Sequence, residues 1–317
     1  MLRRFSFASP YTPTVRLGVL DVGSNSVHLE VIDAHHSAPP IPFASFKHEI
    51  KLTEYLDTNN EISQSGVIAL IEAIGESSER ASELELDELL AFATSAIREA
   101  DNSEHVLQEV RDRLGIDLQV LSGDEEAQFT FLAVRRWYGW SAGELLVFDI
   151  GGGSLEIAQG VEERASFTKS VMLGAGRLTR NFLDGDPFTE KSIRKLEEYV
   201  IETLRPISRE IQIAPNQIGV GTSKTFRTLD KLIREFLNGK SLGLTAESIE
   251  EIVGGLSKMT FKERKGLPGV SQNRANQIVA GALVAKHIVK EFKLHRIQTC
   301  PWALREGIVL RRLDWIN

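Results

Sequence analysis

The stretch that decides the fold is LLVFDIGGGSLE, residues 145–156, in which an apolar run ends in Asp149 and a glycine turn follows. A buried strand would place Asp149 near its carboxyl end, and glycines without Cβ atoms would let backbone N–H groups approach an anion. The pattern recurs in LGVLDVGSNS, residues 17–26, with Asp21 in the equivalent place, and more weakly in IGVGTS, residues 218–223. The two aspartates are 128 positions apart. The repeated pattern therefore predicts a duplicated unit, with two lobes whose hairpins face one phosphate chain.

Length and composition favour an ordinary globular protein with more than one core. The chain has 317 residues, of which 42% are hydrophobic and 26% charged, so two domains are expected. The single Cys300 excludes an intrachain disulfide and a multi-cysteine zinc site, in keeping with a reducing, cytoplasmic location. No apolar run is long enough to cross a membrane. Residues 1–14 lack the apolar segment of a signal peptide, and we expect a frayed leader there.

Charge is distributed unevenly along the chain. The formal net charge of −7 argues against a general nucleic-acid binder. Residues 257–317 nevertheless carry twelve Lys or Arg against four Asp or Glu. This basic part could line a path for a polyanion, or its charges could lie on solvated helix faces. The sequence leaves both interpretations open.

Apolar periodicity and turn residues predict alternating strands and helices. Strands are expected at residues 15–23, 27–34, 43–50, 89–94, 117–121, 155–160, 165–173, 218–221 and 295–300, besides the strand that ends at Asp149. Helices are expected at residues 63–84, 102–115, 122–138, 189–204, 245–259, 273–289 and 303–313, with a further one directly after residue 221. We expect Pro206 to end the helix that begins at Thr189. The alternation indicates an α/β protein.

Glu126 is the candidate general base. Ser122 and Glu125 have the spacing of a capping box, which gives Glu125 a structural task at a helix N-terminus. Glu126, about 100° further round that helix, is left free to face a cleft. Phosphoryl transfer to water needs a positioned base, and Glu126 could serve as one. The alternative is simple placement of negative charge at the positive end of the helix dipole.

Asp149, Glu156 and Asp21 are candidate metal ligands. Asp149 and Glu156 are seven residues apart across the glycine turn, so a hairpin would point both carboxylates into one cavity. Hard carboxylate oxygens near phosphate-binding amides suit Mg²⁺, with Mn²⁺ as a further possibility. The alternative is that each aspartate hydrogen-bonds the backbone of its own turn.

Arg98 is the first candidate for stabilising charge on a phosphoryl group, because it follows a strand that ends in small hydroxylated residues. Its alternative is a surface arginine. Lys224, Arg274 and Arg305 are weaker candidates on position alone. The seven histidines show no metal-ligand spacing beyond the loop pair His35 and His36, and the chain lacks the G-x-S-x-G, Walker A and G-x-G-x-x-G patterns.

Seven motifs in order resemble those of a known family: DVGSNS (21–26), ATSAIREA (93–100), SGDEEA (122–127), DIGGGSLE (149–156), LGAGRLT (173–179), RANQIVAG (274–281) and LREG (304–307). The chain resembles the Ppx/GppA family of exopolyphosphatases and guanosine-pentaphosphate phosphohydrolases, in the actin–hexokinase–Hsp70 superfamily. It is most similar to the short, two-domain actinobacterial exopolyphosphatases. The resemblance implies a two-lobed, actin-like (ribonuclease H-like) α/β fold with an inter-lobe cleft. We expect domain I at residues 1–125, rejoined by the C-terminal helix 303–317, domain II at residues 126–302, and a homodimer.

The resemblance also implies roles for individual residues. Glu126 would orient or deprotonate the attacking water, Asp149 and Glu156 would hold the metal with Asp21 as the matching acid, and Arg98 would bind phosphate. The phosphate cradle would comprise Gly23, Ser24, Asn25, Ser26, Gly151, Gly152, Gly153, Ser154, Thr222, Ser223, Lys224 and Arg274.

Three positions depart from the pattern of the family. Leu155 stands where threonine is frequent and removes a hydroxyl beside the cradle, Lys224 replaces a glycine, and Asn276 replaces an aspartate. Lys224 and Asn276 make the second lobe less negative, which would suit a longer polyanion.

The motifs and the resemblance together predict an exopolyphosphatase that releases orthophosphate from inorganic polyphosphate, without nucleic-acid or membrane partners. The nearest alternative is a phosphohydrolase of guanosine pentaphosphate (pppGpp) or another nucleotide polyphosphate. A kinase of the same superfamily is disfavoured by the acidic context of Glu126. A non-catalytic polyphosphate or nucleotide sensor is a further alternative, which would bind these substrates without turnover.

Overall fold

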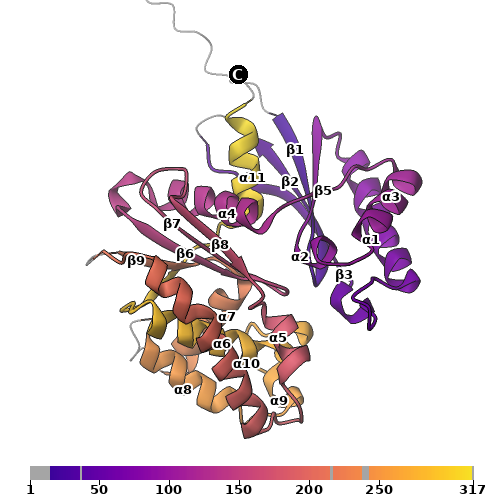
Figure 1. Cartoon of the computed structure of the whole chain (residues 1–317). Coiled ribbons are helices and arrows are strands. Elements are labelled where there is room, and N and C mark those ends of the chain that lie inside the picture. The colour runs from indigo at the N-terminus through magenta and orange to yellow at the C-terminus, as the bar shows by residue number, and fades with distance from the viewer. Residues whose placement is uncertain (1–14, 36–37, 215–216, 238–242, 316–317) are drawn as a thin grey trace, which may run out of the picture.

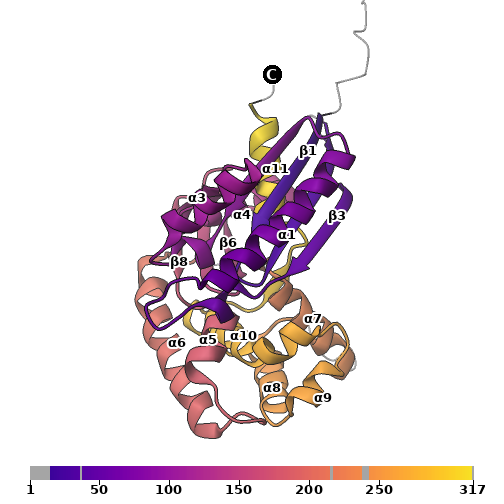
Figure 2. The same ribbon diagram turned by 90° about the vertical axis from the view of Figure 1, so that its right-hand side faces the viewer.

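Two five-stranded sheets form the framework of the computed structural model, which describes residues 15–35, 38–214, 217–237 and 243–315. The expected leader (residues 1–14) and His36 lie outside the described residues. The sheets belong to two lobes, each covered by its own helices (Figures 1 and 2).

The two sheets have the same topology. The first has the order β3-β2-β1-β4-β5, and the second has the order β10-β9-β6-β7-β8. In each, three antiparallel strands are followed by two strands parallel to the first, so the predicted duplication is confirmed at the level of the fold. The strands are β1 (Val15–Val22), β2 (Ser26–Ala34), β3 (Pro42–Glu49), β4 (Glu88–Ala93), β5 (Gln119–Val120), β6 (Leu145–Ile150), β7 (Leu155–Gly160), β8 (Phe167–Val171), β9 (Ile218–Gly221) and β10 (Ile297–Thr299).

Helices cover both faces of both sheets (Figure 1). Helices α1 (Gln64–Glu83) and α3 (Ser103–Leu114) lie on the outer face of the first sheet, while α4 (Gly123–Tyr138) and α11 (Leu304–Leu313) lie between the sheets. The far side of the second sheet carries α5 (Ala175–Phe182), α6 (Glu190–Glu210), α7 (Lys224–Phe236), α8 (Ala246–Leu256), α9 (Phe261–Lys265) and α10 (Gln272–Glu291). Short helices are η1 (Leu52–Tyr55), α2 (Ser95–Arg98) and η2 (Trp140–Ala142).

The central strands are apolar on both faces because helices cover both. In β1, Leu17 and Val19 pack towards α11, whereas Leu20 and Val22 pack in the core beneath α1. Side chains alternate across a strand, so these two pairs face opposite layers.

Helix α11 returns the end of the chain to the first sheet. Ile308, Val309 and Leu313 pack against β1 and β2, and Gly307 lies against α4. A Cβ atom at Gly307 would overlap the backbone carbonyl of Phe129, so this glycine lets the two helices cross closely. The division of the chain at residue 125 stays a prediction.

Three sequence-based expectations differ from the structure. Helix α6 runs on to Glu210, so the prediction that Pro206 ends it was wrong: a proline removes one backbone hydrogen bond, but Leu204 and Ile207 stay packed in the core. Helix α3 begins where predicted, and Asn102 is the residue type expected to cap it. Its side chain instead accepts from the N–H of Ile62 and donates to the carbonyl of Ile62, at 2.9 Å each. Helices α2, α5 and α9 were not predicted, and α5 is the one that shapes the site.

Gly115 ends α3 in the left-handed region, as expected, with φ 67°. Within the part of the chain that the structure describes, no helix combines the length and apolarity needed to span a bilayer.

Candidate active site

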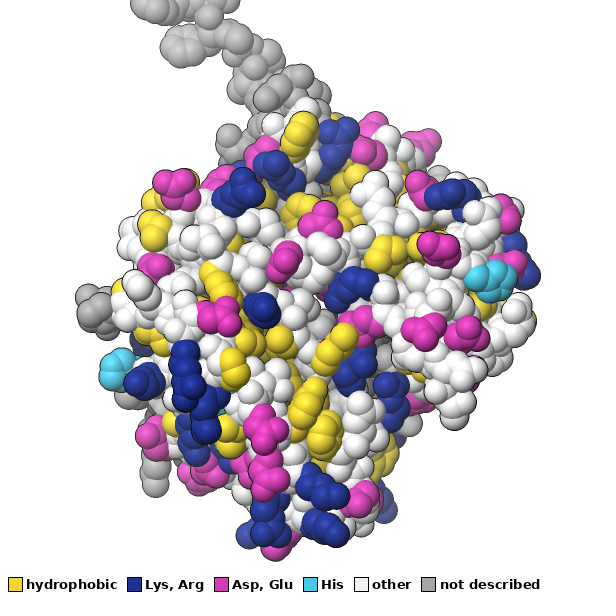
Figure 3. All heavy atoms as spheres, viewed as in Figure 1, with side chains coloured by type: hydrophobic (Ala, Val, Ile, Leu, Met, Phe, Trp, Pro, Cys, Tyr) yellow, Lys and Arg dark blue, Asp and Glu magenta, His cyan; other side chains and the backbone are white. Residues whose placement is uncertain are grey.

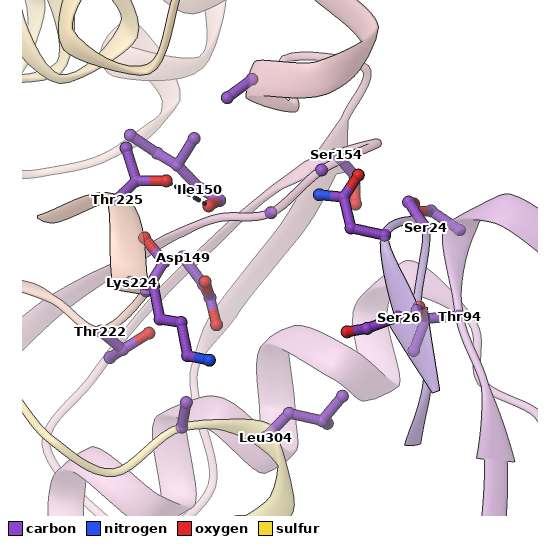
Figure 4. A pocket seen from close by; sticks show the side chains of 18 of the residues that line it. Ser24, Ser26, Thr94, Asp149, Ile150, Ser154, Thr222, Lys224, Thr225 and Leu304 are labelled. Atoms are coloured by element: carbon purple, nitrogen blue, oxygen red, sulfur yellow. Dashed lines mark hydrogen bonds between the residues drawn. The ribbon is translucent and has the colours of Figure 1, made fainter. Parts of the chain in front are cut away.

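A pocket of about 250 Å³ lies between the lobes, where the two hairpin tips meet. Figure 4 shows Asp149 and Lys224 of the second lobe on one side and Ser24, Ser26 and Thr94 of the first lobe on the other. The predicted residues that line it are Asp21, Gly23, Ser24, Asn25, Ser26, Glu126, Asp149, Gly151, Gly152, Ser154, Glu156, Thr222, Ser223, Lys224, Arg274 and Arg305. Gly153 and Arg98 are outside that lining.

The two hairpin tips close in the same way. The N–H of Gly23 donates to the carbonyl of Ser26 at 3.0 Å, and the N–H of Gly151 donates to the carbonyl of Ser154 at 2.9 Å. Across the second hairpin Asp149 is the partner of Glu156, whereas across the first Asp21 is the partner of His28. Cross-strand partners share a face, so Asp149 and Glu156 both point into the pocket, as predicted.

The N-terminus of α5 orients the second tip. Its N–H groups at Ala175 and Arg177 donate to the carbonyls of Gly151 and Gly152, at 2.9 and 3.0 Å. Among the described residues, no backbone carbonyl accepts a hydrogen bond from the N–H groups of Gly152 and Ser154. These two residues line the pocket, so the tip can offer backbone donors to an anion.

Gly152 and Gly153 are also needed because the lobes approach each other closely. A Cβ atom at Gly152 would lie 2.7 Å from Asn25 Nδ2 and 3.1 Å from Ser24 Cβ. A Cβ atom at Gly153 would meet the hydroxyls of Ser95 and Ser24. Asn25 in turn exchanges two hydrogen bonds of 3.3 Å with Gln277 of α10. The glycine turn is therefore a contact between lobes as well as a candidate phosphate cradle.

The acids of the pocket have raised pKa values. Burial raises the pKa of Asp149 to about 6, and burial together with the charge of Asp149 raises the pKa of Glu156 to about 7. Burial and the charge of Glu156 also raise the pKa of Glu126 well above its usual value. Ionising all of these groups costs free energy unless positive charge compensates them.

Asp21 differs from Asp149 in having a cationic partner. Arg305 Nη1 lies 3.3 Å from Asp21 Oδ2, and Arg305 Nε lies 3.2 Å from Glu30 Oε2. Burial raises the pKa of Asp21, and Arg305 opposes that rise. Among the described residues, no group of three or more Asp, Glu, His or Cys side chains is placed to hold a metal ion without further ligands. The assignment of Asp149, Glu156 and Asp21 as metal ligands stays a prediction.

Glu126 occupies the seam between the lobes. The capping box of Ser122 and Glu125 is present, with Ser122 N donating to Glu125 Oε2 at 2.8 Å, and Glu126 is the next residue, buried and lining the pocket. Arg98 pairs with Glu126 and donates to the carbonyl of Leu121 at 2.7 Å. Arg98 therefore contacts the pocket acid Glu126 and does not itself line the pocket.

Several cations that line the pocket have no carboxylate of the described residues within ion-pair distance. In the described part of the chain, the side chains of Lys224, Arg227 and Arg274 form no ion pair or hydrogen bond with another residue, although all three line the pocket. Partial desolvation, and then the positive charge of Lys47, lower the pKa of Lys224 to about 8. A polyanion would supply the missing negative charge.

Sequence reasoning missed Arg227, Lys47, His28 and Gln277. Arg227 could have been found, because it lies one turn beyond Lys224 on the predicted helix. Lys47 and His28 belong to strands that the sequence does not bring together. Burial and nearby cations lower the pKa of His28 to about 3, so it is neutral, and its Nε2 lies 2.7 Å from Ser45 Oγ.

Leu155 has a structural explanation. Its side chain is fully buried in the core of the second lobe, between two residues that point into the pocket. A residue at this position faces away from the pocket, so its missing hydroxyl removes nothing from the lining.

Two lobes of one topology with a pocket between their hairpins define the actin-like two-domain class. A model of the Ppx/GppA phosphatase family matches residues 31–315. The chain is 46% identical to Exopolyphosphatase 1 of Mycobacterium tuberculosis over 305 residues, covering 95% of this chain and 89% of that protein. It is 43% identical to Exopolyphosphatase 1 of Mycobacterium leprae, covering 95% of this chain and 90% of that protein. The chain belongs to the Ppx/GppA phosphatase family.

Solved structures confirm the fold. An exopolyphosphatase from Cytophaga hutchinsonii superposes with a TM-score of 0.85 at 24% identity, covering 95% of this chain and 99% of that one. A Ppx/GppA family member from Aquifex aeolicus superposes with a TM-score of 0.79 at 23% identity, covering 96% of this chain and 100% of that one. The expected actin-like two-domain fold is thus confirmed.

Proposed function

We propose that the chain is an exopolyphosphatase, which hydrolyses the terminal phosphoanhydride bond of inorganic polyphosphate and releases orthophosphate. Its membership of the Ppx/GppA phosphatase family and its relatives named Exopolyphosphatase 1 support this. The observation that carries the proposal is the composition of the pocket. Buried acids lie beside cations without protein counter-ions, an arrangement that suits a phosphate chain held next to a reacting water.

The cations and the glycine turns would bind the end of the chain. Lys224, Arg227 and Arg274 would neutralise the phosphates, while the N–H groups of Gly152 and Ser154 would donate to the terminal phosphoryl oxygens. Binding at several points aligns the terminal phosphorus with the attacking water, which supplies much of the rate enhancement in phosphoryl transfer.

Glu126 would take the proton of the attacking water at its carboxylate. Burial and Glu156 raise its pKa, which makes it a stronger base than an exposed glutamate whenever it is ionised. Arg98, paired with Glu126, would favour the ionised carboxylate and hold its orientation.

Asp149 and Glu156 fit a divalent cation. They are cross-strand partners in the pocket, and their oxygens are hard donors. Burial raises their pKa values, and the nearby arginines only partly oppose that rise. Mg²⁺ is usually held by one or two carboxylates together with waters and substrate phosphates, so a third protein ligand is not required. The ion, Mg²⁺ or Mn²⁺, would supply positive charge to the phosphoryl oxygens.

Release of orthophosphate from polyphosphate by the purified protein, with Mg²⁺ or Mn²⁺, tests the proposal. Glu126→Gln should lower the turnover number by about a hundredfold or more while polyphosphate binding persists. Glu125→Gln is the matched control, because glutamine also serves in a capping box. Turnover unchanged in Glu126→Gln would remove Glu126 from its role, and the absence of orthophosphate release by the wild-type protein would overturn the proposal.

The same assay separates the alternative functions. Faster release from guanosine pentaphosphate than from polyphosphate would instead identify a nucleotide polyphosphate phosphohydrolase. Tight binding of either compound without turnover would identify a sensor.

A further inference from the structure

A second groove, of about 290 Å³, continues from the pocket along α7. It shares Lys224, Arg227 and Arg274 with the pocket and adds Thr228, Lys231 and Gly269. We call these six residues the α7 groove. Four of them are cations, and the described lining contains no acid.

The geometry of α7 makes this groove a continuous row of positive charge. Lys224, Arg227 and Lys231 are exposed and occupy positions i, i+3 and i+7, which share one face of a helix, while Leu229 and Ile233 pack in the core. Lys231 lies about 10 Å further along the helix axis than Lys224. Several phosphate units are needed to reach from the first of these cations to the last.

Gly269 forms the wall opposite the end of this row. A Cβ atom there would lie 3.0 Å from Lys231 Cδ, so the glycine backbone contacts the stem of the lysine side chain. Lys231 lines the groove, and its Nζ also lies 4.0 Å from Glu235 Oε1 on the next turn of α7. An exposed pair of this kind contributes little, so the ammonium group stays available to a polyanion.

Another groove that meets the pocket has the wrong charge for a polyanion. It meets the pocket at Lys47, and α1 contributes Glu76, Glu79 and Glu83 to it. Its cations are paired with carboxylates: Lys47 Nζ lies 2.8 Å from Glu49 Oε1, and Arg80 Nη1 lies 2.9 Å from Glu83 Oε2. A chain of phosphates leaving the pocket would be repelled here and attracted along α7.

We propose that the α7 groove binds the distal phosphates of the same polyphosphate chain whose terminal phosphate occupies the pocket, with Lys231 as the outermost contact. This inference rests on the proposed function and adds a length-sensing subsite to it. Affinity should rise with chain length until the chain reaches Lys231. The described lining has no aromatic side chain on which a base could stack, which favours inorganic polyphosphate over a nucleic acid.

The test compares tripolyphosphate with a long-chain polyphosphate, in direct binding and in steady-state turnover. Lys231→Gln should weaken binding and raise KM for the long chain on the order of threefold, and Lys231→Glu about tenfold, with tripolyphosphate unaffected. Arg234→Gln is the matched control, because it removes one charge from the same helix at a residue that pairs with Asp230 outside the groove. The long-chain effect should shrink at high salt, since exposed charges are screened.

Equal effects of Lys231→Glu on both substrates, or no effect on either, would overturn the inference. If the wild-type protein shows no turnover but Lys231→Glu still weakens binding of the long chain alone, the proposed function fails and the length-sensing subsite stands. If turnover is normal and length dependence is unchanged in Lys231→Glu, the function stands and the subsite fails. Competition by an oligonucleotide with the same number of phosphates, as effective as polyphosphate, would also overturn the choice of ligand.

Discussion

The two hairpin tips have the same backbone and different chemistry. In each, an aspartate on the first strand precedes a turn closed by a glycine N–H and a serine carbonyl. Asp21 lies opposite the neutral His28 and is paired with Arg305, whereas Asp149 lies opposite a second acid, Glu156. The same turn geometry can therefore support different chemistry. The residue on the opposite strand and the side chains of the nearest helix determine the charge around the aspartate.

The helices that follow the parallel strands enlarge this difference. In the first lobe β4 leads into the four-residue α2, which ends in Arg98, and Arg98 is engaged by Glu126. In the second lobe β9 leads into the 13-residue α7, which presents Lys224 and Arg227 to the pocket. The second lobe thus contributes two acids, Asp149 and Glu156, and two cations, Lys224 and Arg227, that form no ion pair among the described residues.

Replacing the two aspartates should have unequal effects, and this is the largest effect we expect. Asp149→Asn should lower turnover by about a hundredfold or more and weaken Mn²⁺ binding, because one of two proposed ligands is lost. Asp21→Asn should lower turnover about tenfold, through misplacement of Arg305. Steady-state rates and Mn²⁺ titration of both variants make the comparison.

Stability without metal gives an independent check of these variants. Asp149→Asn removes a buried acid that repels Glu156, and should leave the free energy of unfolding unchanged or raise it by about 1 kcal/mol. Asp21→Asn removes a partner of Arg305 and should lower the free energy of unfolding by about 1–3 kcal/mol. Equal losses of activity and stability in both variants would contradict the division of tasks between the tips.

Replacing Gly152 and Gly23 with alanine should show whether glycine is needed for the close approach of the lobes or for the conformation of the turn. Gly152→Ala should destabilise the protein by about 1–3 kcal/mol, because the new methyl group meets Asn25, which is held by Gln277. At Gly23 a Cβ atom would have ordinary contacts, 3.6 Å from Ser26 O and 3.9 Å from Asp21 Oδ1, so Gly23→Ala should be neutral or slightly stabilising. Denaturant unfolding measures both, and equal destabilisation would show that the turns, and not the approach of the lobes, need glycine.

Much of this arrangement could be predicted from local sequence. Asp149 and Glu156 flank a short turn, so strand periodicity alone places both carboxylates on one face. The capping box at Ser122 and Glu125 likewise indicated that Glu126 faces the pocket. These predictions held because each depends on residues that are close in the chain.

Contacts between distant segments could not be predicted in the same way. The pairing of Asp21 with Arg305 joins residues 284 positions apart, and that of Asn25 with Gln277 joins residues 252 apart. The pairing of Arg98 with Glu126 depends on how α2 meets α4, which local patterns do not encode. The prediction that Pro206 ends α6 was wrong for a related reason: packing of α6 in the core outweighed the lost hydrogen bond.

The pH dependence of substrate affinity should reveal how much the charge of Lys224, in the second lobe, contributes to binding. Of the effects predicted here, we expect this one to be the smallest. The pKa of Lys224 in the folded protein is lowered to about 8, so the substrate-free protein loses this charge as the pH rises through 8. His28 of the first lobe, with a pKa of about 3, stays neutral over the same range. Affinity for tripolyphosphate should therefore fall on the order of threefold between pH 7 and pH 9.5.

Lys224→Arg provides the control for this pH effect, because a guanidinium group stays protonated throughout the range. Its affinity should be flat with pH, while Lys224→Gln should be weak and flat. The sign of the linkage gives a second measurement: the unfolded chain holds the proton of Lys224 up to a higher pH than the folded protein does, so this group makes stability rise between about pH 8 and pH 10.5. Bound phosphate raises the pKa of Lys224 and should reduce that rise. An affinity that falls equally in the wild type and in Lys224→Arg would assign the titration to another group and remove Lys224 from the comparison between lobes.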